Sequence, residues 1–368
     1  MLILAALALA LWLALLLAPW QAWRCRERLE SEPSASPSRN KFSVLIPARN
    51  EAAVIAETLA ALRADVPDAT VILVDDESDD HTDGLARASG LINLKIISGT
   101  PPPAGWSGKL WALEQGLKEI HSARVLLLDA DIRLAPGMLA ALQRKADEGY
   151  ALVSVLAEPC WQGTGVRLLL PVFVYFFKLL YPFALANRAG NRMAAAAGGV
   201  ILIERKVLAN LGGFSAWRDA IIDDCTLAAR AKRSGQRCFL ALTHGAQSRR
   251  LQPPGALFAM VARSAYVQLH ESPLWLLAAS VLMALAFWVP PVALAFGGAT
   301  RWLGLAALLA LILSYIPTLL YYRRNPLSAI LLPLIAGWFL AATWYSALRA
   351  WTGTRSVWKQ RRYHRQRS

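Results

Sequence analysis

Long apolar stretches near both ends of the chain constrain its fold most strongly. About 20 consecutive apolar residues form a helix that crosses a hydrocarbon core of roughly 30 Å. The chain, whose mean hydropathy is +0.37, has such stretches at residues 1–20, 274–296, 302–321 and 327–348. We therefore expect an N-terminal transmembrane anchor over residues 1–22 and C-terminal transmembrane helices over residues 273–348, with a separate domain between them.

The charges beside these stretches predict how the chain crosses the membrane. Arg24, Arg26 and Arg28 follow the first apolar stretch, whereas a secretory signal peptide carries its positive charge before it. The positive-inside rule then places the following domain in the cytoplasm, as part of a multi-pass membrane protein. Counting three more crossings puts the basic tail, residues 349–368, outside, against the rule. Either the stretch interrupted by Pro290-Pro291 fails to cross fully, or the tail is an exception.

The net charge of +14 does not predict nucleic-acid binding. Residues 349–368 alone carry seven Arg or Lys and no acid, and a basic tail beside an apolar segment is more simply a contact for anionic lipids. No zinc-finger spacing or aromatic RNA-binding signature accompanies the charge. The four cysteines lack Cys-x-x-Cys spacing, which is typical of a reducing compartment.

Another apolar stretch, residues 166–186, is unlike the others because charges and prolines interrupt it. Arg167, Lys178 and Arg188 punctuate the stretch, and Pro171 and Pro182 lie within it. This pattern favours a segment in the membrane interface whose basic side chains reach the headgroups. A buried core helix of the domain between the apolar ends explains it equally well.

Between the apolar ends, residues 41–272 alternate between apolar runs and helical patterns. Such alternation predicts an α/β domain with a mainly parallel sheet and helices on both faces. The expected strands are residues 43–47, 71–75, 94–97, 124–129 and 200–203, and the expected helices are residues 51–63, 82–89, 109–120 and 221–233. Residues 31–39, rich in serine and proline, form a linker before this domain.

The first strand-to-helix turn, Pro47-Ala48-Arg49-Asn50-Glu51, contains no glycine, and Asn50 can cap the helix. A dinucleotide-binding Rossmann unit would have Gly-x-Gly-x-x-Gly here, so the sequence argues against a dehydrogenase. The second strand ends in Asp75-Asp76, and a carboxylate at such an end can accept hydrogen bonds from a base or a ribose. Ligands of open α/β sheets bind at this edge.

Asp129-Ala130-Asp131 closes the apolar run 124–128 at a strand end. Two carboxylates spaced by one residue can offer oxygens to Mg²⁺ or Mn²⁺ shared with a diphosphate. Further along, Gly198-Gly199 would let a backbone or ligand approach closely. Asp223-Asp224 opens a helix, where acids also act simply as caps that favour the helix dipole.

In this order, these motifs resemble family 2 inverting glycosyltransferases of the nucleotide-sugar-binding GT-A fold. The resemblance is carried by Pro47-Ala-Arg-Asn-Glu51, Val74-Asp-Asp76, Asp129-Ala-Asp131, Gly198-Gly199 and Asp223-Asp224-x-x-Leu227, and it spans roughly residues 43–273. Residues 104–112, 194–199 and 222–228 look like the glycosyltransferases associated with hopanoid biosynthesis, usually lettered B.

The resemblance implies a role for each matching residue. Asp75 would contact the uracil or ribose of a UDP-sugar donor, Asp129 and Asp131 the metal and the diphosphate, and Lys109 the donor region. Pro47 and Glu51 belong to the donor-site motif. Asp224 would act as general base, with Asp223 beside it in the donor site. Processive members carry Gln-x-x-Arg-Trp; only Arg263 of that motif is present here, so a diphosphate contact is expected but polymer synthesis is not.

A lipid acceptor fits the membrane segments better than a soluble one, and the resemblance implies a role in hopanoid-associated lipid metabolism. Two alternatives remain open. The chemistry could act on a polyprenyl phosphate or a glycerolipid instead, or the chain could be a non-catalytic membrane scaffold for hopanoid enzymes. The intact set of Asp75, Asp129, Asp131 and Asp224 argues against the scaffold.

Overall fold

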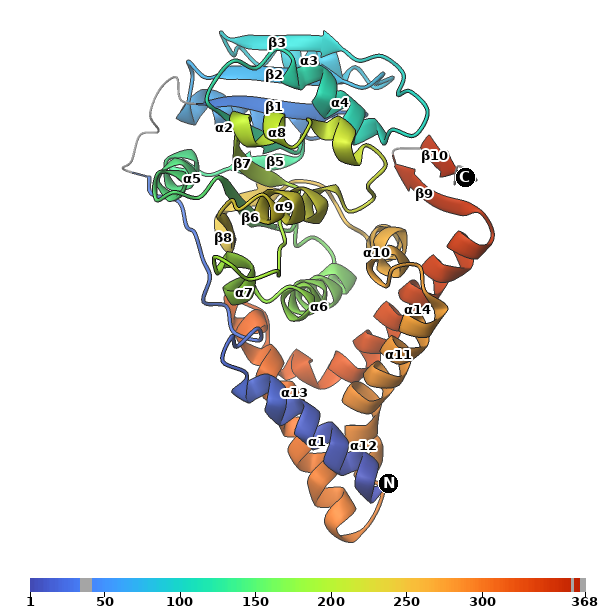
Figure 1. Cartoon of the computed structure of the whole chain (residues 1–368). Helices are drawn as coiled ribbons and strands as arrows, with labels where there is room; N and C mark the ends of the chain where they lie inside the picture. Colours follow the sequence, from blue (N-terminus) through green and yellow to red (C-terminus); the bar gives the residue numbers. More distant parts are fainter. Residues whose placement is uncertain (34–41, 359–360, 365–368) are drawn as a thin grey trace. The chain divides into compact units, whose positions relative to one another are not determined.

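The computed structural model describes residues 1–33, 42–358 and 361–364 and divides into two compact units (Figure 1). We call Met1–Arg26, Trp161–Ala184 and Gln252–Ser356 the helical unit. We call the second unit the α/β unit. It consists of Glu27–Cys160 without residues 34–41, of Leu185–Leu251, and of the described residues after 356. Residues 34–39 of the linker expected at residues 31–39, and residues 359–360 and 365–368 of the basic tail, lie outside the described residues.

The α/β unit is built on an eight-stranded sheet with the order β3-β2-β1-β4-β7-β6-β8-β5. The strands are β1 (Phe42–Ala48), β2 (Thr70–Asp75), β3 (Leu94–Ser98), β4 (Arg124–Leu128), β5 (Ile132–Leu134), β6 (Leu152–Glu158), β7 (Val200–Glu204) and β8 (Cys238–Ser248). Strands β3, β2, β1 and β4 run parallel, as the sequence predicts. Strand β7 is antiparallel to both of its neighbours and β5 is antiparallel to β8, so the complete sheet is mixed.

Apolar side chains on both faces of the sheet explain why its first strands are nearly continuous hydrophobic runs. Along β1, Val44 and Ile46 belong to one core cluster and Leu45 to the other, because successive side chains of a strand point to opposite faces. The helices of this unit are α2 (Ile55–Asp65), α3 (Thr82–Arg87), α4 (Gly108–Leu117), α5 (Met138–Asp147), α8 (Arg205–Asn210) and α9 (Asp223–Arg233), with the 3₁₀ helix η1 (Phe214–Trp217). Helix α2 contributes to the first cluster, and α4 and α9 contribute to the second.

The helical unit contains three helices long and apolar enough to cross a membrane: Pro273–Ala293, Gly298–Tyr321 and Pro326–Trp351. Its elements are α1 (Leu2–Leu17), α6 (Thr164–Leu180), α10 (Pro254–Gln268), α11 (Pro273–Met283), the π-helical turn η2 (Ala284–Trp288), α12 (Val289–Ala293), α13 (Gly298–Tyr321), η3 (Pro326–Leu331) and α14 (Leu332–Trp351). Helix α7 (Phe183–Asn187) and the short strands β9 (Thr354–Trp358) and β10 (Arg361–His364) complete the chain.

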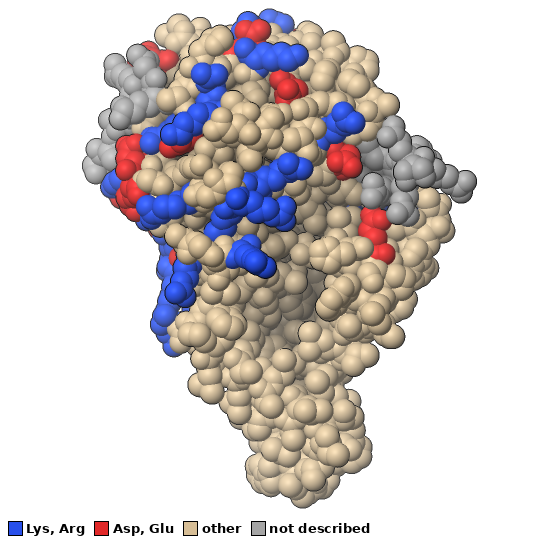
Figure 2. Space-filling view, in the orientation of Figure 1, with Lys and Arg blue, Asp and Glu red and all other residues tan. Residues whose placement is uncertain are grey.

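The surface of these helices is apolar where a soluble protein would carry charge. Leu274, Leu334 and Trp302 are 74%, 74% and 69% exposed. In the view of Figure 2, the end of the helical unit that carries α1, α12 and the start of α13 shows neither acidic nor basic side chains. Large exposed apolar surfaces of this kind mark contacts with membranes or protein partners.

Two expectations about these helices need correction. Helix α6 belongs to the helical unit, so it is not a core helix of the α/β unit. Lys178 does not reach outward to headgroups, because it is 2% exposed and its Nζ donates to the carbonyl oxygens of Trp23 and Arg24 at 3.2 and 3.3 Å. Whether the stretch that contains Pro290-Pro291 crosses a membrane fully stays a prediction; in the structure a π-helical turn leads directly into α12 there.

Candidate active site

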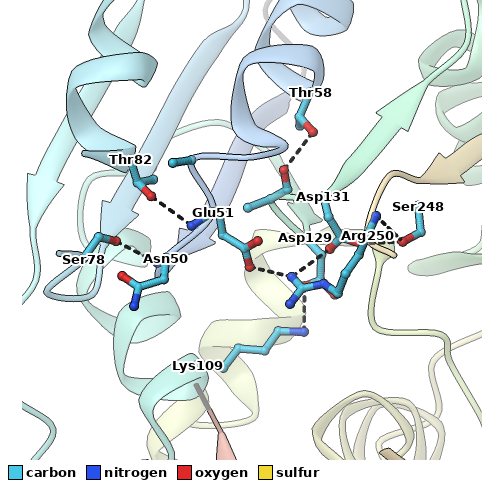
Figure 3. Close-up of polar contacts among 12 residues, drawn as sticks. Asn50, Glu51, Thr58, Ser78, Thr82, Lys109, Asp129, Asp131, Ser248 and Arg250 are labelled. Atoms are coloured by element: carbon cyan, nitrogen blue, oxygen red, sulfur yellow. Dashed lines mark hydrogen bonds and ion pairs between the residues drawn. The ribbon is translucent and has the colours of Figure 1, made fainter. Parts of the chain in front are cut away.

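The turn Asp129-Ala130-Asp131 lies between β4 and β5, and the surrounding backbone holds it firmly (Figure 3). The amide of Asp129 donates to the carbonyl of Gly199 at 3.0 Å, which ties the turn to the start of β7. Thr58 of α2 is fully buried, and its hydroxyl donates to the carbonyl oxygen of Ala130 at 2.8 Å. The side chains of Asp129 and Asp131 therefore project from a backbone turn that two hydrogen bonds, to Gly199 and from Thr58, hold in place.

Lys109 connects this turn with the acidic pair of α9. It lies in the first turn of α4, whose N-cap is Ser107. Its Nζ is 2.8 Å from Asp129 Oδ1 and 3.8 Å from Asp223 Oδ2. Burial lowers the pKa of Lys109, but the charges of Asp129 and Asp223 outweigh burial and raise the pKa above its usual value. The ammonium group is therefore a permanent positive charge between two carboxylates.

Asp224 is held by two backbone amides from different elements. Its Oδ1 accepts from the amide of Cys225 at 2.7 Å, and its Oδ2 accepts from the amide of Gly198 at 2.8 Å. A Cβ at position 198 would lie 3.1 Å from Asp224 Oδ2 and 3.4 Å from Lys109 Nζ, so glycine is what allows this close approach. The Asp224 carboxylate thus does more than cap its own helix.

The environment of Asp224 suits a group that accepts protons near neutral pH. Burial and then the neighbouring charge of Asp223 raise the pKa of Asp224 to about 6, although Lys109 and the two amides act in the opposite direction. Burial also raises the pKa of Asp129 above its usual value, against the effect of Lys109. Carboxyl groups with different environments in one site commonly divide the acid–base roles.

A second basic residue, Arg250, was not predicted from the sequence. It follows β8, and its guanidinium lies 2.5 Å from Glu51 Oε1 and 3.3 Å from Asp131 Oδ1. Ser248 Oγ donates to Asp131 Oδ2 at 2.5 Å, so both oxygens of that carboxylate have partners (Figure 3). The only signal in the sequence is an Arg-Arg pair after a strand, which by itself indicates nothing about the site.

The structure brings several of the predicted residues around one pocket of the α/β unit. Its lining combines polar with apolar and aromatic side chains. It consists of Pro47, Lys109, Leu110, Leu113, Leu127, Leu128, Asp129, Gly198, Ile201, Phe214, Trp217, Asp223, Asp224 and Leu227. A concave surface with a few convergent polar groups is the usual form of a small-molecule site.

The remaining predicted residues lie elsewhere. Asp75 is the last residue of β2, and its Oδ1 is buried without a hydrogen-bond partner. Arg263 lies on α10 of the helical unit, whereas the other predicted site residues belong to the α/β unit. Asn50 does not cap the first helix, because that helix begins at Ile55. Instead Asn50 has a left-handed φ of 52°, and its Oδ1 accepts from the amide of Asp79 at 3.0 Å.

Asp129 and Asp131 are the ligands that the sequence predicts for a metal ion. Among the residues that the structure describes, no group of three or more His, Cys, Asp or Glu side chains is arranged to hold a metal ion. Asp129 and Asp131 nevertheless fit Mg²⁺ or Mn²⁺, because Mg²⁺ binds through one or two carboxylates together with substrate phosphates and water. These residues would supply only part of the coordination, and a bound diphosphate would supply more.

Residues 43–212, just under half of the chain, match the family model described as Glycosyl transferase family 2. Among solved structures, a mannosyltransferase from Pyrobaculum calidifontis in complex with GDP-Man and Mn²⁺ is 21% identical, with a TM-score of 0.54 over 95% of this chain and 98% of that chain. Glucosyl-3-phosphoglycerate synthase from Mycobacterium tuberculosis, in complex with Mn²⁺, UDP and phosphoglyceric acid, is 17% identical, with a TM-score of 0.43 over 66% of this chain and 86% of that chain. No curated protein matches.

The family match and the architecture agree. Residues 43–212 of the α/β unit match the family 2 glycosyltransferase model, and the mixed sheet has the GT-A-like α/β architecture, which confirms the predicted fold class. The chain thus combines a region that is similar to family 2 glycosyltransferases with helices that are long and apolar enough to cross a membrane.

Proposed function

We propose that the protein is a membrane-bound, metal-dependent inverting glycosyltransferase that moves a sugar from a nucleoside diphosphate donor to a lipid. The observation that carries this proposal is the placement of Asp224. Its carboxylate lines the same pocket as Lys109 and Asp129, and its pKa of about 6 makes it a base at neutral pH. A positioned base of matched pKa commonly accelerates a reaction by about 10²- to 10⁴-fold.

In the proposed reaction, Asp224 accepts the proton of the acceptor hydroxyl as that oxygen attacks the anomeric carbon of the donor. The two backbone amides keep the carboxylate in position for this transfer. Attack from the face opposite the leaving diphosphate inverts the anomeric centre. Asp75 would contact the base or ribose of a UDP-sugar, and Lys109 would compensate charge near the diphosphate.

The departing diphosphate needs positive charge, which this site supplies only in part. Asp129 and Asp131 would hold Mg²⁺ or Mn²⁺, and the metal, when bound, neutralises charge on the leaving group. Lys109, whose Nζ lies 2.8 Å from Asp129 Oδ1, would supply a further positive charge. We retain Arg263 as a proposed diphosphate contact, and Pro47, Glu51 and Asp223 as proposed members of the donor site.

A lipid acceptor is supported by the three helices that are long and apolar enough to cross a membrane. A nucleotide-sugar donor supports a cytoplasmic catalytic domain, residues 41–272, with the apolar segments in a bacterial inner membrane. Within this class we propose hopanoid-associated lipid metabolism, which rests on the similarity of residues 104–112, 194–199 and 222–228. We propose no nucleic-acid partner.

The test compares the lipids of a deletion strain with those of the same strain carrying the wild-type gene or the Asp224→Asn gene. A glycolipid that is lost on deletion and restored only by the wild type would support the proposal, and its structure would identify the sugar and the acceptor. Restoration by both genes would instead indicate a non-catalytic scaffold. A missing product built on a polyprenyl phosphate or a glycerolipid would move the acceptor away from hopanoids.

A further inference from the structure

Both carboxylates proposed to bind the metal already have a positively charged partner within the chain. Lys109 Nζ lies 2.8 Å from Asp129 Oδ1, and the guanidinium of Arg250 lies 3.3 Å from Asp131 Oδ1. Asp131 is only 6% exposed, so its charge is poorly screened by water. A divalent cation arriving at this turn would meet two occupied carboxylates and two like charges.

Arg250 is itself anchored on Glu51, a buried residue whose backbone is hydrogen-bonded. Its shortest contact is to Glu51, at 2.5 Å. Glu51 is buried, and its backbone amide donates to Thr82 Oγ1 at 2.9 Å. A guanidinium has several donors in a fixed planar arrangement, so it can keep one carboxylate while it exchanges another oxygen partner. Figure 3 shows Arg250 between the carboxylates of Glu51 and Asp131.

We propose that Arg250 occupies Asp131 until a divalent cation and a nucleoside diphosphate bind together, and that it then pairs with the diphosphate while Glu51 keeps it in place. This inference rests on the proposed donor site. It assigns Arg250 as a diphosphate-binding residue and Glu51 as the residue that positions it. The incoming diphosphate offers oxygens that form strong charge-assisted hydrogen bonds with a guanidinium.

The exchange makes metal binding and diphosphate binding depend on each other. Without a diphosphate, a cation that binds Asp131 takes this carboxylate away from Arg250. The guanidinium then keeps Glu51 as a charged partner, and it lies beside the positive charge of the cation. With a diphosphate, Arg250 gains a new partner and Asp131 becomes free for the metal. Since such coupling is reciprocal, Mn²⁺ must tighten UDP binding by the same factor by which UDP tightens Mn²⁺ binding.

The test measures binding rather than turnover, using the full chain in detergent. Free Mn²⁺ is followed by electron paramagnetic resonance and UDP by calorimetry, each with and without the other, and GDP replaces UDP in a parallel series. In Arg250→Gln, Mn²⁺ alone should bind about fivefold tighter or more, because Asp131 has lost its competing partner. The coupling between Mn²⁺ and UDP should fall by about the same factor.

Arg249→Gln is the matched control because it removes the same charge at the neighbouring position. The Arg249 guanidinium lies 2.7 Å from Glu57 Oε2, and only its backbone amide contacts Asp131, at the carbonyl oxygen. This variant should keep the wild-type metal affinity and coupling. Glu51→Gln should weaken the coupling even though Arg250 is still present, since the arginine has lost its charged anchor.

Three results would overturn the inference. Wild-type metal affinity and coupling in Arg250→Gln would show that Arg250 does not compete for Asp131. Equal shifts in the Arg249 and Arg250 variants would show an effect of overall charge instead of a specific pair. A wild-type protein that binds neither UDP nor GDP with Mn²⁺ would contradict the donor site itself. Far-UV circular dichroism and thermal unfolding of each variant separate these results from misfolding.

Discussion

Replacement of Asp224 by asparagine separates proton transfer from donor binding. The variant cannot accept the acceptor's proton, so turnover should fall by about two orders of magnitude or more. A hundredfold loss corresponds to a rise in the activation free energy of about 2.7 kcal/mol. Donor affinity should stay near the wild-type value. Asp223→Asn should lose much less, because the contact of Asp223 with Lys109 is long, at 3.8 Å, and the proposed role of Asp223 is not proton transfer.

The structure also predicts a stability cost in this variant. Each oxygen of Asp224 accepts one backbone amide, from Gly198 or from Cys225. Asparagine has one acceptor oxygen, so one of these amides faces an NH₂ group and loses its partner. An unsatisfied buried donor costs about 1–3 kcal/mol in the free energy of unfolding. Thermal unfolding should therefore shift downward, and the kinetic comparison must be made well below that transition.

The pH dependence gives an independent check of the same residue. A carboxylate must be ionised to act as a base, and the pKa of Asp224 is raised to about 6. The kcat/KM of the wild type should thus be about tenfold higher at pH 7 than at pH 5, and Asp224→Asn should lack this rise. The assay is sugar transfer, or slow donor hydrolysis, by purified protein. Near-normal turnover in Asp224→Asn together with an inactive Asp223→Asn would refute the assignment of the base.

Three further predictions concern the metal, the turn and the membrane. Excess chelator should abolish transfer or donor hydrolysis, and Mn²⁺ or Mg²⁺ should restore it; full activity in chelator would rule out the proposed metal. Thr58→Val should weaken metal-dependent donor binding and lower the free energy of unfolding by about 1–3 kcal/mol, since the carbonyl of Ala130 loses its donor, whereas Thr58→Ser should keep both. A cysteine placed at Ser89 should resist an impermeant reagent in intact cells and react after permeabilisation; labelling of intact cells would contradict a cytoplasmic domain.

The sequence predicted most of the strands that are buried on both faces. Strands β1, β2, β4 and β7 are short apolar runs with clear ends, which is the pattern that periodicity detects well. Strands β5, β6 and β8 were not identified, and β5 has only three residues, too few to show a period. The antiparallel direction of β7 was also missed, because a strand's residues do not encode its direction and residues 161–184 of the helical unit separate it from β6.

The candidate site was predictable where its residues lie in short motifs at element ends. Asp129, Asp224 and Lys109 line one pocket, although their catalytic roles stay predictions. The contacts of Asp131 could not be anticipated, since Ser248 and Arg250 follow it by 117 and 119 positions and belong to no motif. Asn50 shows the opposite failure, because its local pattern favours a helix cap while a contact with Asp79 decides its actual conformation.

The acidic character of the site contrasts with the net charge of +14 of the whole chain. Within the site the acids Glu51, Asp129, Asp131, Asp223 and Asp224 outnumber the bases Lys109 and Arg250. A nucleotide sugar paired with a divalent cation carries almost no net charge, so long-range attraction contributes little to its capture. Added salt should therefore leave donor binding nearly unchanged, while it weakens adhesion of the basic chain to anionic lipids. Ionic strength thus offers a simple way to vary the contacts between basic side chains and anionic headgroups, while the apolar helices stay inserted and donor occupancy is unaltered.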